Sequence, residues 1–327
     1  MTDSINIVGT GYYLPEKVLT NADLEKMVDT SDEWIVSRTG IRERRLAGPE
    51  ETVSMMAAQA AQAAIARAGL TAEDIDLILL GTFTPDRQLP SAACLLQARL
   101  GVKEAASWDF SAACSAFLYG LEMGTGLLRT GKYRHILLVA AEKLTSVVDW
   151  QDRNTCVLFG DGAGAVVLGL NGGQGRVIDC TIGADGSKDK LLEIPAGGCE
   201  EPITPEVLEA RRNFVRMEGR ETFKVAVSRM ARACKTLLKR NGLSPDDVTW
   251  LVPHQANLRI MKGVAKAVGI PVERVYINVD RLGNMSGATV PIALAEMDHN
   301  EVLKKGDLVL LVAFGGGLTW GASLIEW

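Results

Sequence analysis

The sequence is poor in histidine, has no paired cysteine motif and contains no long apolar segment. It has three histidines and six cysteines in 327 residues, and no two cysteines have Cys-x-x-Cys spacing. A zinc site is therefore not expected, and the cysteines are predicted to be free thiols of a reducing compartment. No apolar run approaches the roughly 20 residues that cross a bilayer. The start, "MTDSINIVGTGYYLP", lacks the regions of a secretory signal, so we expect a cytoplasmic protein with no membrane partner.

The chain also lacks an excess of basic residues. Its 35 Lys and Arg are outnumbered by 40 Asp and Glu, which gives a net charge of -5. A general nucleic-acid binder neutralises phosphates with a basic surface, so no nucleic-acid partner is expected, although a local basic patch stays compatible with this charge. The hydrophobic content of 47% is that of a globular protein, and the length favours two domains or two fused halves.

Strand-like and helix-like segments alternate along the chain. Residues 75–82, 106–110 and 135–142 are apolar and bounded by turn residues, as buried strands are. Residues 54–69 are rich in alanine and end in glycine, which is typical of a helix. This alternation predicts an α/β fold in which helices pack on sheets.

The two parts of the chain resemble each other at a fixed offset. "RAGLTAEDIDLILLGT" aligns with "RNGLSPDDVTWLVPHQ", and "HILLVA" aligns with "DLVLLVA", each displaced by 173 residues. We therefore predict a duplicated unit, with halves at residues 1–171 and 172–327 and a junction near the glycine-rich residues 170–176.

The same offset relates several loops that carry reactive residues. It pairs Cys114 with Gly287, and it pairs Ser111 with Asn284. Gly81, at the end of a predicted strand, pairs with His254. Since sites in α/β proteins lie at strand ends, we expect these loops to meet in one cleft.

Cys114 lies in "SWDFSAACSAFLYGLEMGTGLL", between a strand-like and a helix-like segment. A thiol at a helix N-terminus is expected to have a lowered pKa and to be a good nucleophile, and the small neighbours let a substrate approach. The alternative is a small buried core residue. Cys94, in the similar "PSAACLLQARL", is interpreted as such a core residue because its helix is amphipathic.

Two further polar residues and a glycine run have settings that suit catalysis. His254 follows the strand-like "VTWLV", where it could act as an acid, a base or a hydrogen-bond donor, or be a structural histidine. Asn284, in "DRLGNMSGATVP", is either a turn residue or an amide donor to a developing enolate oxygen. The run at residues 315–317 is either a tight turn or backbone placed close to a ligand.

The chain resembles a known family through several motifs in order. "DFSAACSAF", "VPHQANLRI", "GNMSGATVP" and "AFGGGLTWG", together with "TSDEWIVSRTGIRERR" and "TCVLFGDGAGAVVL", resemble β-ketoacyl-[acyl carrier protein] synthase III, whose members initiate bacterial fatty acid synthesis. The resemblance implies an α/β thiolase fold, with duplicated βαβαβαββ halves in a five-layer αβαβα sandwich. It also implies a homodimer without metal or redox cofactor, which condenses a primer acyl-coenzyme A with malonyl-acyl carrier protein.

The resemblance implies roles for individual residues. Cys114 would carry the acyl group, His254 and Asn284 would stabilise the malonyl-derived enolate, and the N–H groups of Cys114 and Gly316 would form the oxyanion hole. The remaining implied residues are Trp34, Arg38 and Arg153 for coenzyme A, Arg259 and Lys262 for the carrier protein, and Leu89, Leu144 and Phe159 for the acyl pocket.

Departures from the family pattern leave the primer open. Leu89 stands where some members have a phenylalanine that reaches across the dimer, and Gly287 stands where some have alanine; both are expected to enlarge the acyl pocket. One alternative is a Cys-His-Asn condensing enzyme of specialised metabolism with a longer or aromatic primer. Another is a non-catalytic acyl-binding protein, which would not need all three residues. A degradative thiolase is disfavoured because no cysteine follows Cys234.

Overall fold

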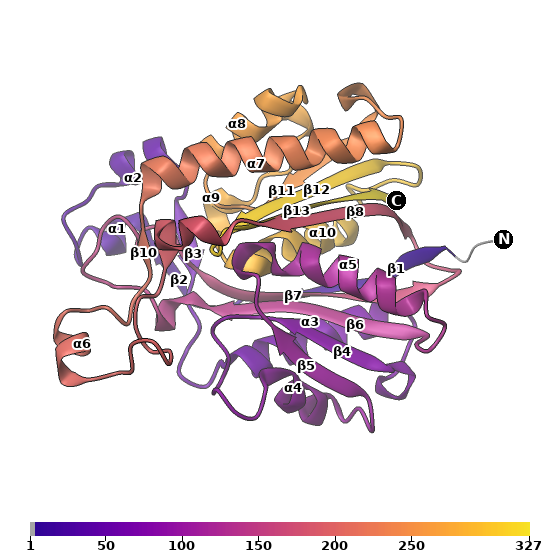
Figure 1. Cartoon of the computed structure of the whole chain (residues 1–327), viewed down its shortest axis with the longest axis horizontal. Helices are drawn as coiled ribbons and strands as arrows, with labels where there is room; N and C mark the ends of the chain where they lie inside the picture. The colour runs from indigo at the N-terminus through magenta and orange to yellow at the C-terminus, as the bar shows by residue number, and fades with distance from the viewer. Residues whose placement is uncertain (1–3) are drawn as a thin grey trace.

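Residues 4–327 are described by the structure, a computed structural model, and strands alternate with helices along them (Figure 1). The first part contains β1 (Ile5–Tyr13), β2 (Val18–Thr20), α1 (Asn21–Leu24), α2 (Asp32–Thr39), β3 (Glu43–Arg45), α3 (Val53–Arg67), β4 (Leu77–Gly81), α4 (Ala92–Leu100), β5 (Ala106–Phe110), α5 (Ala116–Leu128), β6 (His135–Lys143) and β7 (Asp161–Leu170). The second part contains β8 (Gly175–Ala184), β9 (Leu192–Glu193), α6 (Pro205–Glu209), β10 (Arg216–Met217), α7 (Gly219–Arg240), β11 (Trp250–Pro253), α8 (Leu258–Val268), α9 (Val279–Leu282), α10 (Thr289–His299), β12 (Leu308–Gly315) and β13 (Thr319–Glu326). Short 3₁₀ segments lie at η1 (Ala72–Asp74), η2 (Ala113–Ser115), η3 (Leu144–Ser146), η4 (Gly186–Leu191), η5 (Pro245–Asp247), η6 (Val272–Arg274) and η7 (Ser286–Ala288).

The main sheet has two parts that meet at a narrow junction. Its strand order is β11-β12-β13-β8-β1-β7-β6-β4-β5. β1 and β8 pair at two positions only, Asn6 with Arg176 and Ile7 with Gly175. The strands on either side of this junction therefore form a five-stranded part and a four-stranded part, and each part belongs to one half of the sequence repeat.

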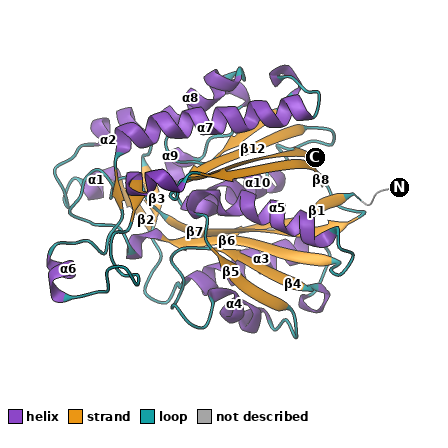
Figure 2. Cartoon of the chain, in the orientation of Figure 1, coloured by secondary structure: helices purple, strands orange, loops and turns teal. Residues whose placement is uncertain are grey.

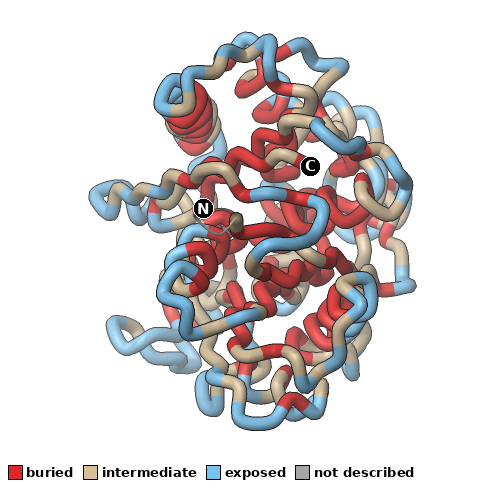
Figure 3. Tube along the Cα trace, turned by 90° about the vertical axis from the view of Figure 1, so that its right-hand side faces the viewer, coloured by how far each residue is buried: buried red, intermediate tan, exposed pale blue. Residues whose placement is uncertain are grey.

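Helices and strand layers alternate through the molecule (Figure 2). Helices α3 and α4 cover the outer side of the five-stranded part, and α7 and α8 cover the outer side of the four-stranded part. Helices α5 and α10 lie between the two parts and pack on both. The five-layer αβαβα arrangement implied by the resemblance is thereby confirmed. Figure 3 shows that buried segments gather in the interior and that exposed segments lie mainly in the outer turns and loops.

The repeat is visible in the positions of the elements. η1 and η5 begin at residues 72 and 245, β4 and β11 at 77 and 250, η2 and η7 at 113 and 286, α5 and α10 at 116 and 289, and β6 and β12 at 135 and 308. Each pair differs by 173 residues, as in 289 − 116 = 173. The second half lacks a full counterpart of β5 and has only a bridge between Leu251 and Val275. The division into residues 1–171 and 172–327 stays an interpretation of this repeat.

Close packing of α3 on β1 depends on small residues at their contact. The helix is rich in alanine, and its buried face lies against the glycines of β1. A β-carbon on Gly11 would overlap the carbonyl oxygen of Ala60 and lie 2.5 Å from the amide nitrogen of Ala64. Because these are backbone atoms of a packed helix, they cannot give way without a shift of the helix.

We predict that Gly11→Ala lowers the free energy of unfolding by about 2 kcal/mol or more, since overpacking against backbone costs 1–3 kcal/mol. Urea denaturation followed by circular dichroism measures this change. Gly126→Ala is the control: a β-carbon on this exposed glycine of α5 meets nothing within 4 Å, and alanine has the higher helix propensity. Equal stability of the two variants would show that α3 does not depend on this close approach.

Candidate active site

Cys114 lies on a tight turn between β5 and α5, as the sequence predicts. It is the middle residue of η2, and the preceding Ala113 has a φ of 45°. The Oγ1 of Thr319 donates a hydrogen bond of 2.9 Å to the carbonyl of Ala112 and thereby ties the turn to β13. A β-carbon on Gly315 would lie 2.6 Å from the amide nitrogen of Cys114, so only glycine lets the end of β12 approach this turn.

The expected low pKa of Cys114 is contradicted. Its side chain is buried, and burial raises the pKa of the thiol to about 11, although the neighbouring Ser286 side chain acts in the opposite direction. A helix N-terminus favours a thiolate, but loss of hydration penalises the charged form more strongly in this position. The Cys114 side chain is therefore a protonated thiol at neutral pH.

His254 follows the end of β11 and faces the same interior. Its Nδ1 lies 2.6 Å from the Oγ1 of Thr289, and no described residue partners its Nε2. Burial lowers the pKa of His254 to about 3, so the imidazole is neutral at physiological pH. A neutral ring carries one proton, and its single vacant nitrogen is the one available to a substrate.

Asn284 is held on both sides by backbone contacts. Its N–H donates to the carbonyl of Leu158 at 2.9 Å, and its carbonyl accepts from the N–H of Gly160 at 3.0 Å. Its side-chain Oδ1 accepts from the N–H of Ser286 at 2.8 Å. This bond orients the amide so that Nδ2, a donor, is the group left for a substrate.

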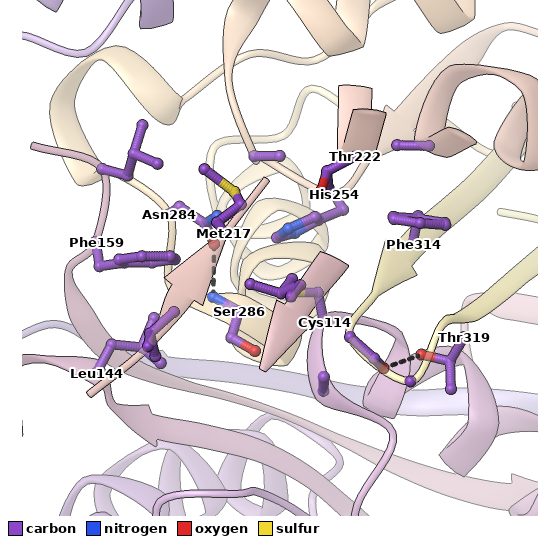
Figure 4. A pocket seen from close by; sticks show the side chains of 18 of the residues that line it. Cys114, Leu144, Phe159, Met217, Thr222, His254, Asn284, Ser286, Phe314 and Thr319 are labelled. Atoms are coloured by element: carbon purple, nitrogen blue, oxygen red, sulfur yellow. Dashed lines mark hydrogen bonds between the residues drawn. The ribbon is translucent and has the colours of Figure 1, made fainter. Parts of the chain in front are cut away.

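These three residues line one cavity of about 400 Å³ (Figure 4). They come from different elements: Cys114 from η2, His254 from the end of β11 and Asn284 from the turn after α9. The expectation that the loops related by the repeat meet in one cleft is confirmed in their geometry. Gly316 borders the same cavity, and so do both Leu144 and Phe159. The other lining residues are mostly apolar and include Phe83, Val148, Leu192, Ile194, Val215, Met217, Ala226, Met230, Ile260 and Phe314.

A second cavity of about 720 Å³ adjoins the first and is rich in basic residues. The two share Leu158, Met217 and Asn257 as walls. The second cavity is lined by Trp34 and by the basic residues Arg38, Arg220, Lys224 and Arg259. A narrow apolar interior thus opens toward a positively charged outer chamber.

Two arginines pack against the Trp34 ring. The guanidinium carbons of Arg38 and Arg153 lie 5.0 and 4.7 Å from the ring centroid. Arg153 also donates to the backbone carbonyl of Asp29 at 2.6 Å. Arg153 does not line the second cavity itself, but its contact with Trp34 places it at the edge.

Besides Arg153, two further predicted site residues lie outside both cavities. Leu89 is 84% exposed in the loop before α4 and does not line the acyl cavity of its own chain. Lys262 is exposed on α8, one turn beyond Arg259. Their implied contacts with a second copy and with a carrier protein stay predictions.

Two smaller interpretations are wrong. Gly287 does not enlarge the cavity, because its missing β-carbon would face the carbonyl of Ala113 at 3.0 Å and the side chain of Ala116 at 3.1 Å. Cys94 lies on helix α4 as expected, but it is exposed and is not a core residue. In both cases a short stretch of sequence does not reveal which side of the element faces the interior.

Sequence reasoning did not find Ser286, Thr289 or Met217 as site residues. Ser286 has a φ of 50° and orients Asn284, Thr289 contacts His254, and Met217 lies between the two cavities. The repeat contains a signal for Ser286, because it is the counterpart of Ala113, which also has a positive φ. No local pattern distinguishes the other two residues.

Residues 4–327 contain neither a metal-binding cluster nor a membrane-spanning helix. No group of three or more His, Cys, Asp or Glu side chains in this range could hold a metal ion. None of the helices in the same range combines the length and apolar character that a membrane span requires.

Comparison with known proteins gives the family. The model of 3-oxoacyl-[acyl-carrier-protein] synthase III matches residues 108–186, and the model of its C-terminal part matches residues 238–327. The β-ketoacyl-[acyl-carrier-protein] synthase III of Roseiflexus sp. (strain RS-1) is 52% identical over 327 residues, which cover 100% of this chain and 99% of the relative. The chain belongs to the β-ketoacyl-[acyl-carrier-protein] synthase III family.

Solved structures of the β-ketoacyl-[acyl-carrier-protein] synthase III family agree with this assignment. The crystal structure of 3-oxoacyl-[acyl-carrier-protein] synthase III from Aquifex aeolicus VF5 is 47% identical, with a TM-score of 0.92 over 99% of this chain and 100% of the other. The priming β-ketosynthase of the R1128 polyketide pathway is also similar, at 31% identity and a TM-score of 0.90 over 99% of this chain and 96% of the other.

We predict that alkylation of Cys114 by iodoacetamide accelerates about tenfold per pH unit from pH 7 to pH 10, without a plateau near pH 9. The thiolate is the reactive form, and a raised pKa keeps its fraction small until the pH approaches 11. Peptide mass spectrometry in a Cys94→Ser, Cys199→Ser background measures the rate, because these two cysteines are exposed. A plateau below pH 8 would mean that the helix N-terminus lowers the pKa of Cys114 more than burial raises it.

Proposed function

We propose that this chain catalyses the decarboxylative Claisen condensation of a primer acyl-coenzyme A with malonyl-acyl carrier protein. The product is a 3-oxoacyl-acyl carrier protein, and the reaction initiates fatty acid synthesis. The observation that carries the proposal is that Cys114, His254 and Asn284 line one apolar cavity in a chain of this family. The enzyme is an acyltransferase, and its thioester substrates supply the chemistry without a resident cofactor.

In the first half-reaction the sulfur of Cys114 attacks the thioester carbonyl of the primer. A new C–S bond forms to Cys114, the bond to the sulfur of coenzyme A breaks, and the thiol proton is transferred overall to the departing coenzyme A. The developing oxyanion accepts hydrogen bonds from the N–H groups of Cys114 and Gly316, which both border the cavity. The apolar walls exclude water, which limits hydrolysis of the acyl-enzyme.

In the second half-reaction malonyl-acyl carrier protein replaces coenzyme A. The bond between the malonyl α-carbon and its carboxylate breaks, CO₂ leaves, and the electron pair remains on an enolate. His254 and Asn284 stabilise the enolate oxygen by hydrogen bonds from neutral groups. The α-carbon then attacks the acyl-Cys114 thioester, the C–S bond breaks, and the sulfur leaves as a thiolate that takes up one proton from the solvent.

The outer chamber suits the polar ends of both substrates. Trp34, Arg38 and Arg153 offer an aromatic face and guanidinium groups to the adenine and phosphates of coenzyme A. Arg259 and Lys262 lie near the mouth, where an acidic carrier protein would dock. Supporting this view, the mouth is basic although the whole chain carries a net charge of -5.

The acyl group extends from Cys114 along Leu144 and Phe159. We assign a homodimer in which Leu89 of one copy completes the acyl pocket of the other, since this leucine is exposed in a single chain. A short acyl primer is favoured over the longer or aromatic primers of specialised metabolism. Relatives named β-ketoacyl-[acyl-carrier-protein] synthase III reach 52% identity, whereas the polyketide priming enzyme is 31% identical.

We expect wild-type protein to gain one acyl group on Cys114 when mixed with acetyl- or another short acyl-coenzyme A, and Cys114→Ser to gain none. Intact-protein mass spectrometry across acetyl-, isobutyryl-, hexanoyl-, octanoyl- and anthraniloyl-coenzyme A measures both the adduct and the primer preference. Labelling that persists in Cys114→Ser, or that is absent with every primer, would contradict the proposed reaction. Preferential labelling by anthraniloyl-coenzyme A would support the alternative in specialised metabolism.

Two charge reversals on α8 distinguish the chamber that both substrates would use from the surface that only the carrier protein would contact. Arg259 lines the outer cavity, whereas Lys262 does not, so Arg259→Glu is expected to raise KM for both malonyl-acyl carrier protein and acyl-coenzyme A on the order of tenfold. Lys262→Glu is expected to raise KM for the carrier protein alone. Steady-state kinetics at two salt concentrations test this pair, because exposed ion pairs weaken in salt. An unchanged KM for the carrier protein in both variants would remove α8 from its docking site.

A further inference from the structure

One side chain makes the only polar contact with the His254 ring among residues 4–327. The Oγ1 of Thr289 lies 2.6 Å from Nδ1, and Thr289 is fully buried as the first residue of α10. The backbone N–H of His254 is already used, because it donates to the carbonyl of Val312 at 2.7 Å. The orientation of the ring and the position of its proton therefore depend on the Thr289 hydroxyl.

The direction of this hydrogen bond follows from the other bonds of Thr289. Its hydroxyl has one proton and two acceptors in reach, Nδ1 of His254 at 2.6 Å and the carbonyl oxygen of Ser286 at 3.0 Å. The Ser286 carbonyl also accepts the backbone N–H of Thr289, so it keeps a hydrogen bond when the hydroxyl proton is donated to Nδ1 instead. A separation of 2.6 Å is typical of an O–H donor and shorter than the usual range of an N–H donor. Both facts favour donation from the hydroxyl to Nδ1.

We infer that Thr289 is a positioning residue that fixes His254 as its Nε2–H tautomer. With Nδ1 occupied as an acceptor, the single proton of the neutral ring sits on Nε2, the nitrogen without a protein partner. His254 then presents an N–H donor to the cavity that the Nδ2 donor of Asn284 also faces. In the other tautomer a lone pair on Nε2 would face the enolate oxygen and repel it.

The consequence for the reaction rests on the proposed function. The enolate step needs two hydrogen-bond donors, and Thr289 supplies one of them indirectly. The acyl-transfer step uses the N–H groups of Cys114 and Gly316. It does not depend on which ring nitrogen of His254 carries the proton. Loss of the Thr289 hydroxyl therefore slows condensation and leaves acylation of Cys114 nearly unchanged.

Nuclear magnetic resonance of protein labelled with ¹⁵N-histidine tests the inference without any turnover. The chain has only three histidines, so His254→Asn identifies the His254 signals by their loss. Wild type is expected to show an Nε2–H ring from pH 6 to pH 8. Thr289→Val, which keeps the branched shape, should lose this preference, and Thr289→Ser should retain it. An Nδ1–H ring in wild type, or an unchanged ring in Thr289→Val, would overturn the inference.

Kinetics complete the test. Thr289→Val is expected to lower the rate of malonyl decarboxylation and condensation about tenfold or more, with acylation of Cys114 within about twofold of wild type. Thr125→Val is the matched control, because this buried hydroxyl donates to the carbonyl of Glu122 on α5 and does not line the cavity. Equal losses in both variants would overturn the specific role of Thr289. If no primer acylates wild type, the proposed function fails, while the resonance data still decide the tautomer.

Discussion

Everything in the site depends on the close contact of two duplicated turns, η2 and η7, at the centre of the molecule. The contact is made by backbone, since a β-carbon on Gly287 would lie 3.0 Å from the carbonyl of Ala113. The end of β12 also packs on η2, because a β-carbon on Gly315 would lie 2.6 Å from the nitrogen of Cys114. Each turn begins at a residue with positive φ, Ala113 in the first half and Ser286 in the second. The nucleophile and the amide donor therefore come from different halves, and their relative placement is set by packed backbone and not by flexible side chains.

Burial at this contact determines the protonation of the site. The pKa of Cys114 is raised to about 11 and that of His254 is lowered to about 3, and in both cases burial is the main cause. The two groups are thus uncharged at neutral pH, so their desolvation costs little before substrate binds. In the proposed reaction, negative charge then develops on the reacting oxygens, where donors are already oriented. A dry site with fixed dipoles stabilises such transient charge better than water, which would have to reorient.

Much of the fold and part of the site could be predicted from the sequence because both derive from the repeat. The 173-residue offset relates η2 to η7 and α5 to α10. It therefore predicts that the loops of Cys114 and Asn284 lie close together. The features that could not be predicted depend on tertiary packing. The local helix predicts a low pKa for Cys114. Burial raises this pKa instead, and burial depends on elements that are distant in the sequence. The contact between Thr289 and His254 joins residues 35 positions apart, and a threonine at the start of a helix has no local sign of such a partner.

In the proposed reaction, the acyl pocket and the enolate donor share one pair of backbone segments. Phe159, which lines the cavity, forms an isolated parallel bridge with Asn284, and hydrogen bonds of 2.9 and 3.0 Å join the two segments. The fully buried Arg44 of β3 donates to the carbonyl of Val157 at 2.7 Å and ties this segment to β3. In the proposed reaction, a primer that moved the Phe159 backbone would therefore also move the backbone of Asn284. Under the proposed function, selection of the primer and stabilisation of the malonyl-derived enolate would then be linked through the same segment.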